Sequence, residues 1–189
     1  VETQSVGSGD PPVSVTTDRV ILPDKRHTLT TNSDTVVTEE IMIGDTIYMR
    51  GTLVSSSIYP SLDPETWISF SPEQAPEDSV LEQRVTYLTT ALRYPFADVT
   101  AVTRALPASP AGEVIVGDRP CKAWTFSTTD DMTEGIEYVL AFDVEGRPCQ
   151  LVREGGGVTE TRTWSYPDNP GPINAPEEAV RVEQFPAAP

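Results

Sequence analysis

The residues that could carry out catalysis are few in this sequence. Its single histidine is His27, which lies between Arg26 and Thr28 in a charged, extended segment. A hydrolase needs a nucleophile, a base and an orienting group, and the Gly-x-Ser-x-Gly motif that presents a nucleophilic serine does not occur. We therefore expect His27 to be a solvent-facing strand residue. We expect no catalytic residues and no enzymatic activity.

Residues that could bind a metal are also sparse. One histidine and two cysteines argue against a zinc site built from these residue types. Asp130, Asp131 and Glu134 cluster in a predicted hairpin loop, where polar residues are common, and they lack the spacing of a calcium-binding EF-hand. No pair of acidic residues is singled out by its context for glycoside hydrolysis. The sequence therefore predicts no metal and no cofactor.

The net charge limits the possible partners. The chain has 13 basic and 29 acidic residues, which gives a formal net charge of -16. Such a chain cannot neutralise a run of phosphates, so nucleic acid is not expected as a partner. The same charge disfavours docking of the fold onto an anionic lipid surface. No stretch approaches 18 consecutive apolar residues, so the sequence predicts no membrane-spanning helix.

The length of 189 residues suits one domain, over residues 18–176, with irregular ends. Residues 1–17 are rich in Gly, Ser, Thr, Pro and acidic residues and have no helical or strand period, which predicts a flexible leader or tether. This leader is either an ordinary disordered terminus or a linker after a removed signal peptide or a lipid-modified cysteine. The acidic, Pro/Ala-rich residues 177–189 predict a loosely held tail.

One helix is clearly predicted, over residues 76–94. Ser79 or Asp78 could cap its start, and Pro95 ends it. Its apolar residues recur at helical spacing and form one continuous stripe, which consists of Leu81, Val85, Leu88 and Leu92. Such a stripe usually packs on a core.

Most of the remaining chain predicts short antiparallel strands. Residues 40–50 indicate a hairpin with a Gly44-Asp45 turn. This turn predicts the pairs Ile43–Thr46, Ile41–Tyr48 and Met42–Ile47. From residue 97 onward the pattern predicts β structure, including the weak alternation of residues 97–105. Residues 107–110 are expected to form a hairpin loop.

The strands near residues 121–126 and 136–142 predict a sheet with one apolar and one polar face. If Thr128 pairs with Ile136, the apolar face consists of Trp124, Phe126, Tyr138, Leu140 and Phe142. We expect this face to point at the helical stripe. One helix is small for a sheet of seven or more strands, so we expect an apolar hollow that these nine residues line and that binds a ligand.

Several segments occur in an order that resembles a known bacterial family. They are Tyr48 in GDTIYMRG, Trp67 in ETWISF, the helix, GDRPCKAWTF, LAFDVEGRPCQLV and WSYPDNPGPINAP, preceded by LPDKRHTLTT. Over about residues 18–176 this order resembles lipoprotein carriers of the LolA/LolB and LppX/LprG type. The resemblance implies an α+β fold, in which a strongly bent antiparallel β-sheet (half-barrel) carries helix on its concave face.

The resemblance implies a non-catalytic function in the bacterial cell envelope, outside the cytoplasm. Members of this family hold lipids or lipidated molecules in the cavity of the half-barrel, and some are anchored by a lipid, which here would lie upstream of Val1. We therefore expect a monomer that binds or transports a lipid or acylated ligand. The alternative is an envelope sensing module of the same fold, which binds a peptide or protein partner, for example by strand addition at a sheet edge.

The two cysteines, Cys121 and Cys149, are expected to form a disulfide. Each follows Arg-Pro and begins a predicted strand, and an even number of cysteines in an exported domain favours a bond. The predicted register argues against it, because the strand 136–142 lies between the two cysteines. Two strand spacings are roughly 10 Å, beyond the Cα separation of about 7 Å that a disulfide tolerates. The bond then requires that the middle strand end early or that the chain bulge at residues 143–146.

Overall fold

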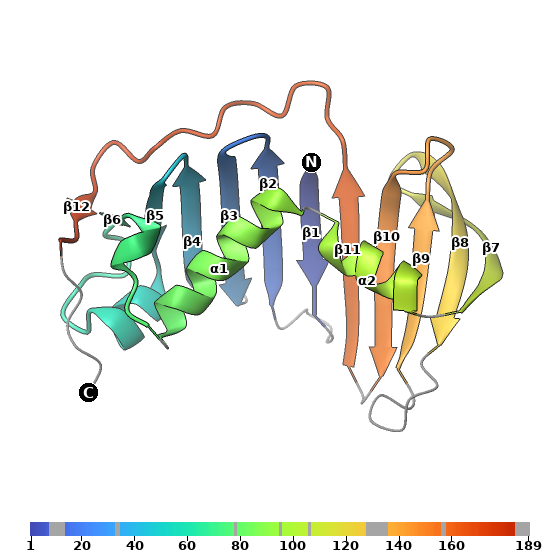
Figure 1. Cartoon of the computed structure of the whole chain (residues 1–189), viewed down its shortest axis with the longest axis horizontal. Helices are drawn as coiled ribbons and strands as arrows, with labels where there is room; N and C mark the ends of the chain where they lie inside the picture. The colour runs from blue at the N-terminus through green and yellow to red at the C-terminus, as the bar shows by residue number, and fades with distance from the viewer. Residues whose placement is uncertain are drawn as a thin grey trace.

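The computed structural model describes residues 1–7, 14–32, 35–77, 79–94, 96–105, 107–127, 136–155 and 158–183. These residues form one open, curved sheet of twelve strands, with two α-helices in front of it in Figure 1. The predicted α+β class with a bent antiparallel sheet is thus confirmed. No helix within the described ranges is long and apolar enough to cross a membrane.

The strand order along the sheet is β12-β6-β5-β4-β3-β2-β1-β11-β10-β9-β8-β7. Neighbouring strands are antiparallel, except that β12 runs parallel to β6. The strands are β1 (Glu2–Val6), β2 (Val15–Ile21), β3 (Lys25–Asn32), β4 (Thr35–Ile43), β5 (Thr46–Arg50), β6 (Ile68–Phe70), β7 (Ala108–Val116), β8 (Arg119–Ser127), β9 (Glu137–Phe142), β10 (Pro148–Gly155), β11 (Val158–Ser165) and β12 (Val180–Arg181).

Helix α1 (Val80–Arg93) confirms the predicted helix, although it begins four residues later than expected. Ser79 caps it by accepting a hydrogen bond from the backbone N–H of Glu82. The predicted stripe of Leu81, Val85, Leu88 and Leu92 is buried, with exposed fractions of 9% or less. It packs against one half of the sheet, on residues of β2, β4, β5 and β6 that include Val20, Met42, Ile47, Met49, Ile68 and Phe70.

Helix α2 (Ala97–Ala105) corrects the prediction of a strand at these residues. Its buried residues Val99 and Val102 lie one helical turn apart and face the other half of the sheet. There they pack against β8, β9, β10 and β11, on a cluster whose buried members are Phe126, Leu140, Leu151 and Trp164. The two helices therefore cover different halves of the same face, hereafter the helix face (Figure 1).

The predicted leader is wrong for the described residues of segment 1–17. Residues 2–6 form β1 in the middle of the sheet, between β2 and β11, and residues 15–17 begin β2. The ammonium group of Val1 donates a hydrogen bond to the carbonyl oxygen of Val20 at 2.8 Å. The strand escaped prediction because its residues are mostly polar, and a polar strand shows no alternation of apolar residues.

The predicted loose tail is also wrong where it is described. After β11 the chain forms a strap, residues 166–179, which runs past the ends of the strands to the other side of the sheet, where β12 pairs with β6 (Figure 1). Arg19 holds this strap by donating to the carbonyl oxygens of Pro170 and Pro172, at 3.0 and 3.2 Å. Ile173 and Val182 are buried. Residues 184–189 lie outside the described residues.

The predicted registers in two hairpins are confirmed. Strands β4 and β5 form the pairs expected around Gly44-Asp45. In β8 and β9, Trp124 lies opposite Leu140 and Phe126 opposite Tyr138; Thr128, which was expected to pair with Ile136, lies outside the described residues. The hairpin loop expected at residues 107–110 is wrong, because β7 already begins at Ala108.

A disulfide joins Cys121 and Cys149, with their Cα atoms 6.6 Å apart. Strand β9 does lie between β8 and β10, as the register predicted, but it ends at Phe142, before it reaches Cys121. The register between β9 and β10 shifts at Cys149 rather than at residues 143–146. The estimate of roughly 10 Å is therefore wrong, because the middle strand stops short. With Ala123 and Ala141, the two cysteines form a buried cluster on a face predicted to be polar.

Candidate functional site

Two adjoining hollows lie on the helix face, near the place where α1 gives way to α2. The larger, hereafter the central hollow, has a volume of about 360 Å³ and is bounded by α1, the start of α2 and strands β1, β2, β3 and β11. The smaller, hereafter the α2 hollow, has a volume of about 320 Å³ and lies between α2 and strands β9, β10 and β11. Asp98 and Arg162 line both. Each volume falls within the range of small-molecule sites, about 300–1,000 Å³.

The central hollow has a polar floor, because the strands there carry hydroxyl and charged side chains. Ser5 lies opposite Thr16 on β2 and opposite Arg162 on β11. Thr16 shares a hydrogen bond with Thr30 across to β3, with 3.1 Å between the hydroxyl oxygens. Ser5, the side chain of β1 in this row, faces the central hollow and not an apolar core. This is why β1 shows no apolar pattern.

A buried ion pair forms one wall of the central hollow. Arg26 is fully buried and donates through Nε and Nη2 to the two carboxylate oxygens of Asp18, at 2.8 and 2.7 Å. Its Nη1 donates to the carbonyl oxygens of Tyr87 and Leu88 on α1, and its guanidinium lies 4.3 Å from the centre of the Tyr87 ring. Burial alone lowers the pKa of Arg26, but the hydrogen bonds to Asp18 outweigh it and raise this pKa above its ordinary value. Arg26 therefore stays charged and holds α1 on the sheet.

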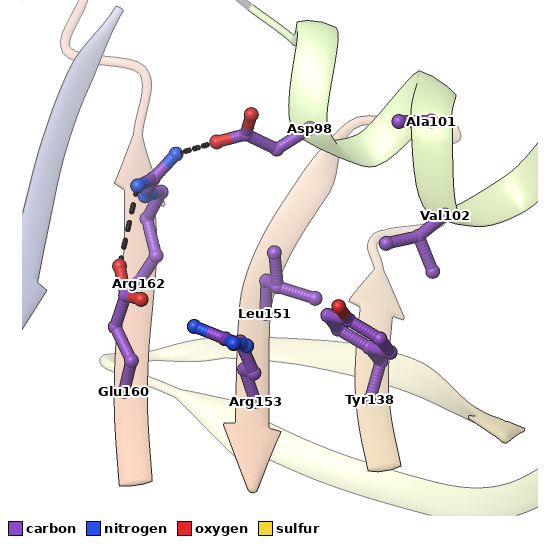
Figure 2. A pocket seen from close by; sticks show the side chains of 8 residues that line it. All are labelled: Asp98, Ala101, Val102, Tyr138, Leu151, Arg153, Glu160 and Arg162. Carbon is purple, nitrogen blue, oxygen red and sulfur yellow. Dashed lines mark hydrogen bonds and ion pairs between the residues drawn. The ribbon is translucent and has the colours of Figure 1, made fainter. Parts of the chain in front are cut away.

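Arg162 stands between the two hollows and connects three elements. Its Nε donates to the hydroxyl oxygen of Ser5 on β1 at 2.9 Å, and its Nη2 lies 3.3 Å from a carboxylate oxygen of Glu160. Its Nη1 forms an ion pair with Asp98 on α2. Figure 2 shows Arg162 reaching from β11 toward Asp98, with Glu160 below it. This side chain therefore ties α2 to the centre of the sheet.

The α2 hollow combines an apolar wall with charged groups. Ala101 and Val102 line it from α2, and Leu151 and Tyr138 line it from the sheet. In Figure 2, Arg153 extends from β10 into the space between Arg162 and Tyr138. Within the described part of the chain, the side chain of Arg153 forms no ion pair or hydrogen bond. In this hollow an alkyl chain can therefore contact Val102 and Leu151, and a negatively charged group can contact Arg153.

The nine residues predicted to line one apolar hollow do not lie together. Leu81, Val85, Leu88 and Leu92 belong to the cluster beneath α1, whereas the aromatic set on β8 and β9 belongs to the cluster beneath α2. Of the nine, only Tyr138 lines either hollow. The prediction that the stripe and the aromatic face point at each other is wrong, because α2 is interposed as the partner of the aromatic face. The hollows instead follow the junction between the helices.

His27 is not a freely solvated residue. Its Nε2 donates to Oε1 of Glu39 at 2.9 Å, and Arg50 binds the other oxygen of Glu39 at 2.7 Å through Nε. Neither His27 nor Glu39 lines either of the two hollows. Among the described residues, no group of three or more His, Cys, Asp or Glu side chains could hold a metal ion. The calcium ligands considered at Asp130, Asp131 and Glu134 lie outside the described residues.

Comparison with known proteins identifies solved structures of similar fold. No protein-family profile and no curated protein matches the sequence. Among solved structures, the lipoprotein LppX of Mycobacterium tuberculosis matches with a TM-score of 0.54 and 11% identity, over 92% of this chain and 88% of LppX. MucB of Pseudomonas aeruginosa, solved with MucA, matches with 0.44 and 14%, over 86% of this chain and 49% of the other.

A LolA-superfamily protein of Nitrosomonas europaea matches with a TM-score of 0.31 and 11% identity, over 88% of this chain and 83% of the other. The likeness to LppX is the strongest of the three and spans nearly the whole of both chains. The chain therefore has an LppX-like fold, in agreement with the resemblance in its order of sequence segments.

Proposed function

We propose that this protein binds a lipid or lipidated molecule, without catalysis, in the two adjoining hollows of the helix face. The observation that carries the proposal is that two separate helices, α1 and α2, cover the helix face. Each helix packs on its own apolar cluster, and the hollows lie along the junction between them. An acyl chain placed there contacts Val102 and Leu151 on one side and Tyr87 and Tyr94 on the other.

Two further observations support the proposal. Tyr87 and Tyr94 are exposed large side chains beside the central hollow, with 42% and 60% of their surface accessible. Covering apolar surface of this kind is favourable, and burial of an alkyl chain contributes about 0.8 kcal/mol per methylene. The disulfide supports a location outside the cytoplasm, because such bonds persist in oxidising compartments. The LppX-like fold agrees with a role in the cell envelope.

A second function, binding of a peptide or protein partner, has one observation in its favour. Strand β7 is the last strand at one edge of the sheet, and it is exposed along most of its length, including Ile115 at 77%. An open edge can accept an added strand. Pro110 and the register shift next to it interrupt part of this edge, as is common in edges that do not pair. We therefore rank this function second.

Three alanines on α2 give a matched test of the first proposal. Ala97 lines the central hollow, Ala101 lines the α2 hollow, and Ala105 lines neither. All three are exposed and stand at intervals of four residues on the same helix. Replacing each by Trp adds the same volume at each place. We expect Ala97→Trp and Ala101→Trp to lower the binding of a twelve-carbon alkyl probe at least tenfold, and Ala105→Trp to leave it unchanged.

The measurement is a titration of dodecyl phosphate and dodecanol into the purified protein, followed by native mass spectrometry and by tryptophan fluorescence. Circular dichroism confirms that each variant remains folded. If all three variants bind as well as the parent protein, the ligand does not occupy these hollows. If the parent protein binds neither probe but captures an extended peptide, the second function takes the place of the first.

A further inference from the structure

We propose that the α2 hollow receives an anionic head group, a phosphate or a carboxylate carried by the alkyl ligand, and that Arg153 and Arg162 bind it. This inference rests on the proposed function, because it assigns the polar end of the same ligand. It adds a chemical class that the fold alone does not specify. The argument has three parts: the placement of the two arginines, their different states of pairing, and the balance of charge around them.

The strand register places the two arginines as diagonal neighbours on the helix face. Leu151 of β10 lies opposite Arg162 of β11, and Arg153 lies opposite Glu160. All four side chains line the same hollow, which fixes their common face. Diagonal residues on adjacent strands are about 7–8 Å apart at Cα, within reach of long side chains. An oxyanion placed between the two strands is therefore within reach of both arginine side chains.

The two arginines differ in how their donors are used. Arg162 is held in place by Ser5, Glu160 and Asp98. Arg153 has no partner within the described residues, and its guanidinium points into the hollow. A guanidinium matches the geometry of a phosphate or a carboxylate better than an ammonium does. The site therefore offers one positioned cation and one cation with all its donors free.

The charged side chains around the α2 hollow leave Arg153 as the group with which an anion would pair. Asp98 and Glu160 are both paired with Arg162, so the four charged side chains that line the hollow sum to zero and Arg153 alone of the four has no side-chain partner among the described residues. In a chain of net charge -16 with only 13 basic residues, three arginines nevertheless line the two hollows: Arg26, Arg153 and Arg162. The adjacent apolar groups of Val102 and Leu151 favour an anion that carries an alkyl chain over a free anion.

The test compares probes that differ only in the head group. Dodecyl phosphate, dodecanoate, dodecanol and inorganic phosphate are titrated into the parent protein and two variants at fixed ionic strength. In Arg153→Gln the proposed anion contact is lost. The control is Arg104→Gln, which removes the same charge from an exposed residue of α2 that lines neither hollow. We expect the parent protein to prefer dodecyl phosphate over dodecanol about tenfold, and only Arg153→Gln to abolish this preference.

The possible outcomes separate the inference from the function on which it rests. Equal binding of dodecanol and both charged probes by the parent protein overturns the anion site but leaves alkyl binding intact. An equal loss in Arg104→Gln and Arg153→Gln overturns it as well, because net charge alone then explains the preference. Inorganic phosphate that binds as tightly as dodecyl phosphate assigns the site to a free anion. Absence of binding by any alkyl probe overturns the proposed function and this inference together.

Discussion

At the scale of single residues, arginine–carboxylate pairs hold the elements of this acidic protein together. Arg26 joins β3 to Asp18 on β2 and to the carbonyl groups of α1. Arg84 on α1 pairs with Glu40, which is fully buried on β4. Breaking such a pair leaves a buried charge without compensation, which is more costly than the pair is stabilising. In both pairs a basic side chain therefore joins α1 to the sheet.

The triplet of His27, Glu39 and Arg50 gives a pH-dependent prediction. The hydrogen bond from His27 lowers the pKa of Glu39, burial opposes this effect, and Arg50 adds to the lowering. Because the folded pKa lies below the unfolded value, the ionised carboxylate stabilises the folded state. This stabilisation is fully present above the ordinary value of 4.5 and is lost as the pH falls through the lower folded pKa.

Glu39→Gln should therefore lower the free energy of unfolding by about 1 kcal/mol at pH 7, and the difference from the parent protein should shrink below pH 4.5. Urea denaturation at several pH values measures it. The control is Glu65→Gln, which removes the other carboxylate bound to Arg50; Glu65 is 73% exposed, so the expected effect is below about 0.5 kcal/mol. Equal effects of the two variants at every pH would contradict the assignment.

The disulfide gives a second prediction at this scale. Cys121 and Cys149 are 28 residues apart in sequence, and closing a loop of this length stabilises the fold by about 3 kcal/mol, mainly through the unfolded chain. The variant with both cysteines replaced by alanine should lose about this amount in urea denaturation. The reduced parent protein serves as the control and should be similarly destabilised. Alkylation of two thiols in the denatured, unreduced protein would disprove the bond.

At the scale of elements, the sequence predicted those parts that have a strong period and missed those that do not. The stripe of α1 and the Gly44-Asp45 hairpin have clear patterns, and both were found with the right register. In α2 the segment ADVTAVTRA is rich in β-branched residues, which lower helix propensity and imitate a strand. Only two of its side chains, Val99 and Val102, are buried, which is too few to define a helical stripe.

The candidate site was mispredicted for the same reason. The sequence predicted no helix at α2, so the helix over residues 76–94 was expected to cover the aromatic face of β8 and β9. The apolar stripe of that helix and the aromatic face were therefore assigned to one hollow. The residues that do line the hollows include Ser5, Thr16 and Arg162, which are polar and widely separated in sequence. Their proximity depends on the pairing of β1 with β11, a contact between residues about 160 positions apart. No local pattern encodes such a pairing.

At the scale of the whole molecule, the sheet consists of two halves that meet at β1. One half, β2 to β6, carries the cluster beneath α1, and the other, β7 to β11, carries the cluster beneath α2. The two clusters are separate, and the row between them is polar, with Thr16, Ser5 and Arg162 in line. The halves are therefore joined at the centre by the backbone hydrogen bonds of β1 rather than by a shared apolar core.

This arrangement predicts that Gln4→Pro uncouples the two halves. Gln4 pairs with Thr17 on one side and Thr163 on the other, and its side chain lines a hollow on the face opposite the helices. Proline removes one N–H from a central strand, where such bonds cannot be replaced. We expect a loss of about 2 kcal/mol or more and a urea transition that splits into two. Hydrogen exchange should become faster in β1, β2 and β11 before it does in the two clusters.

The control for this prediction is Gln4→Val, which keeps the N–H and should unfold in one transition. A single unchanged transition in Gln4→Pro would contradict the role of β1 as the junction.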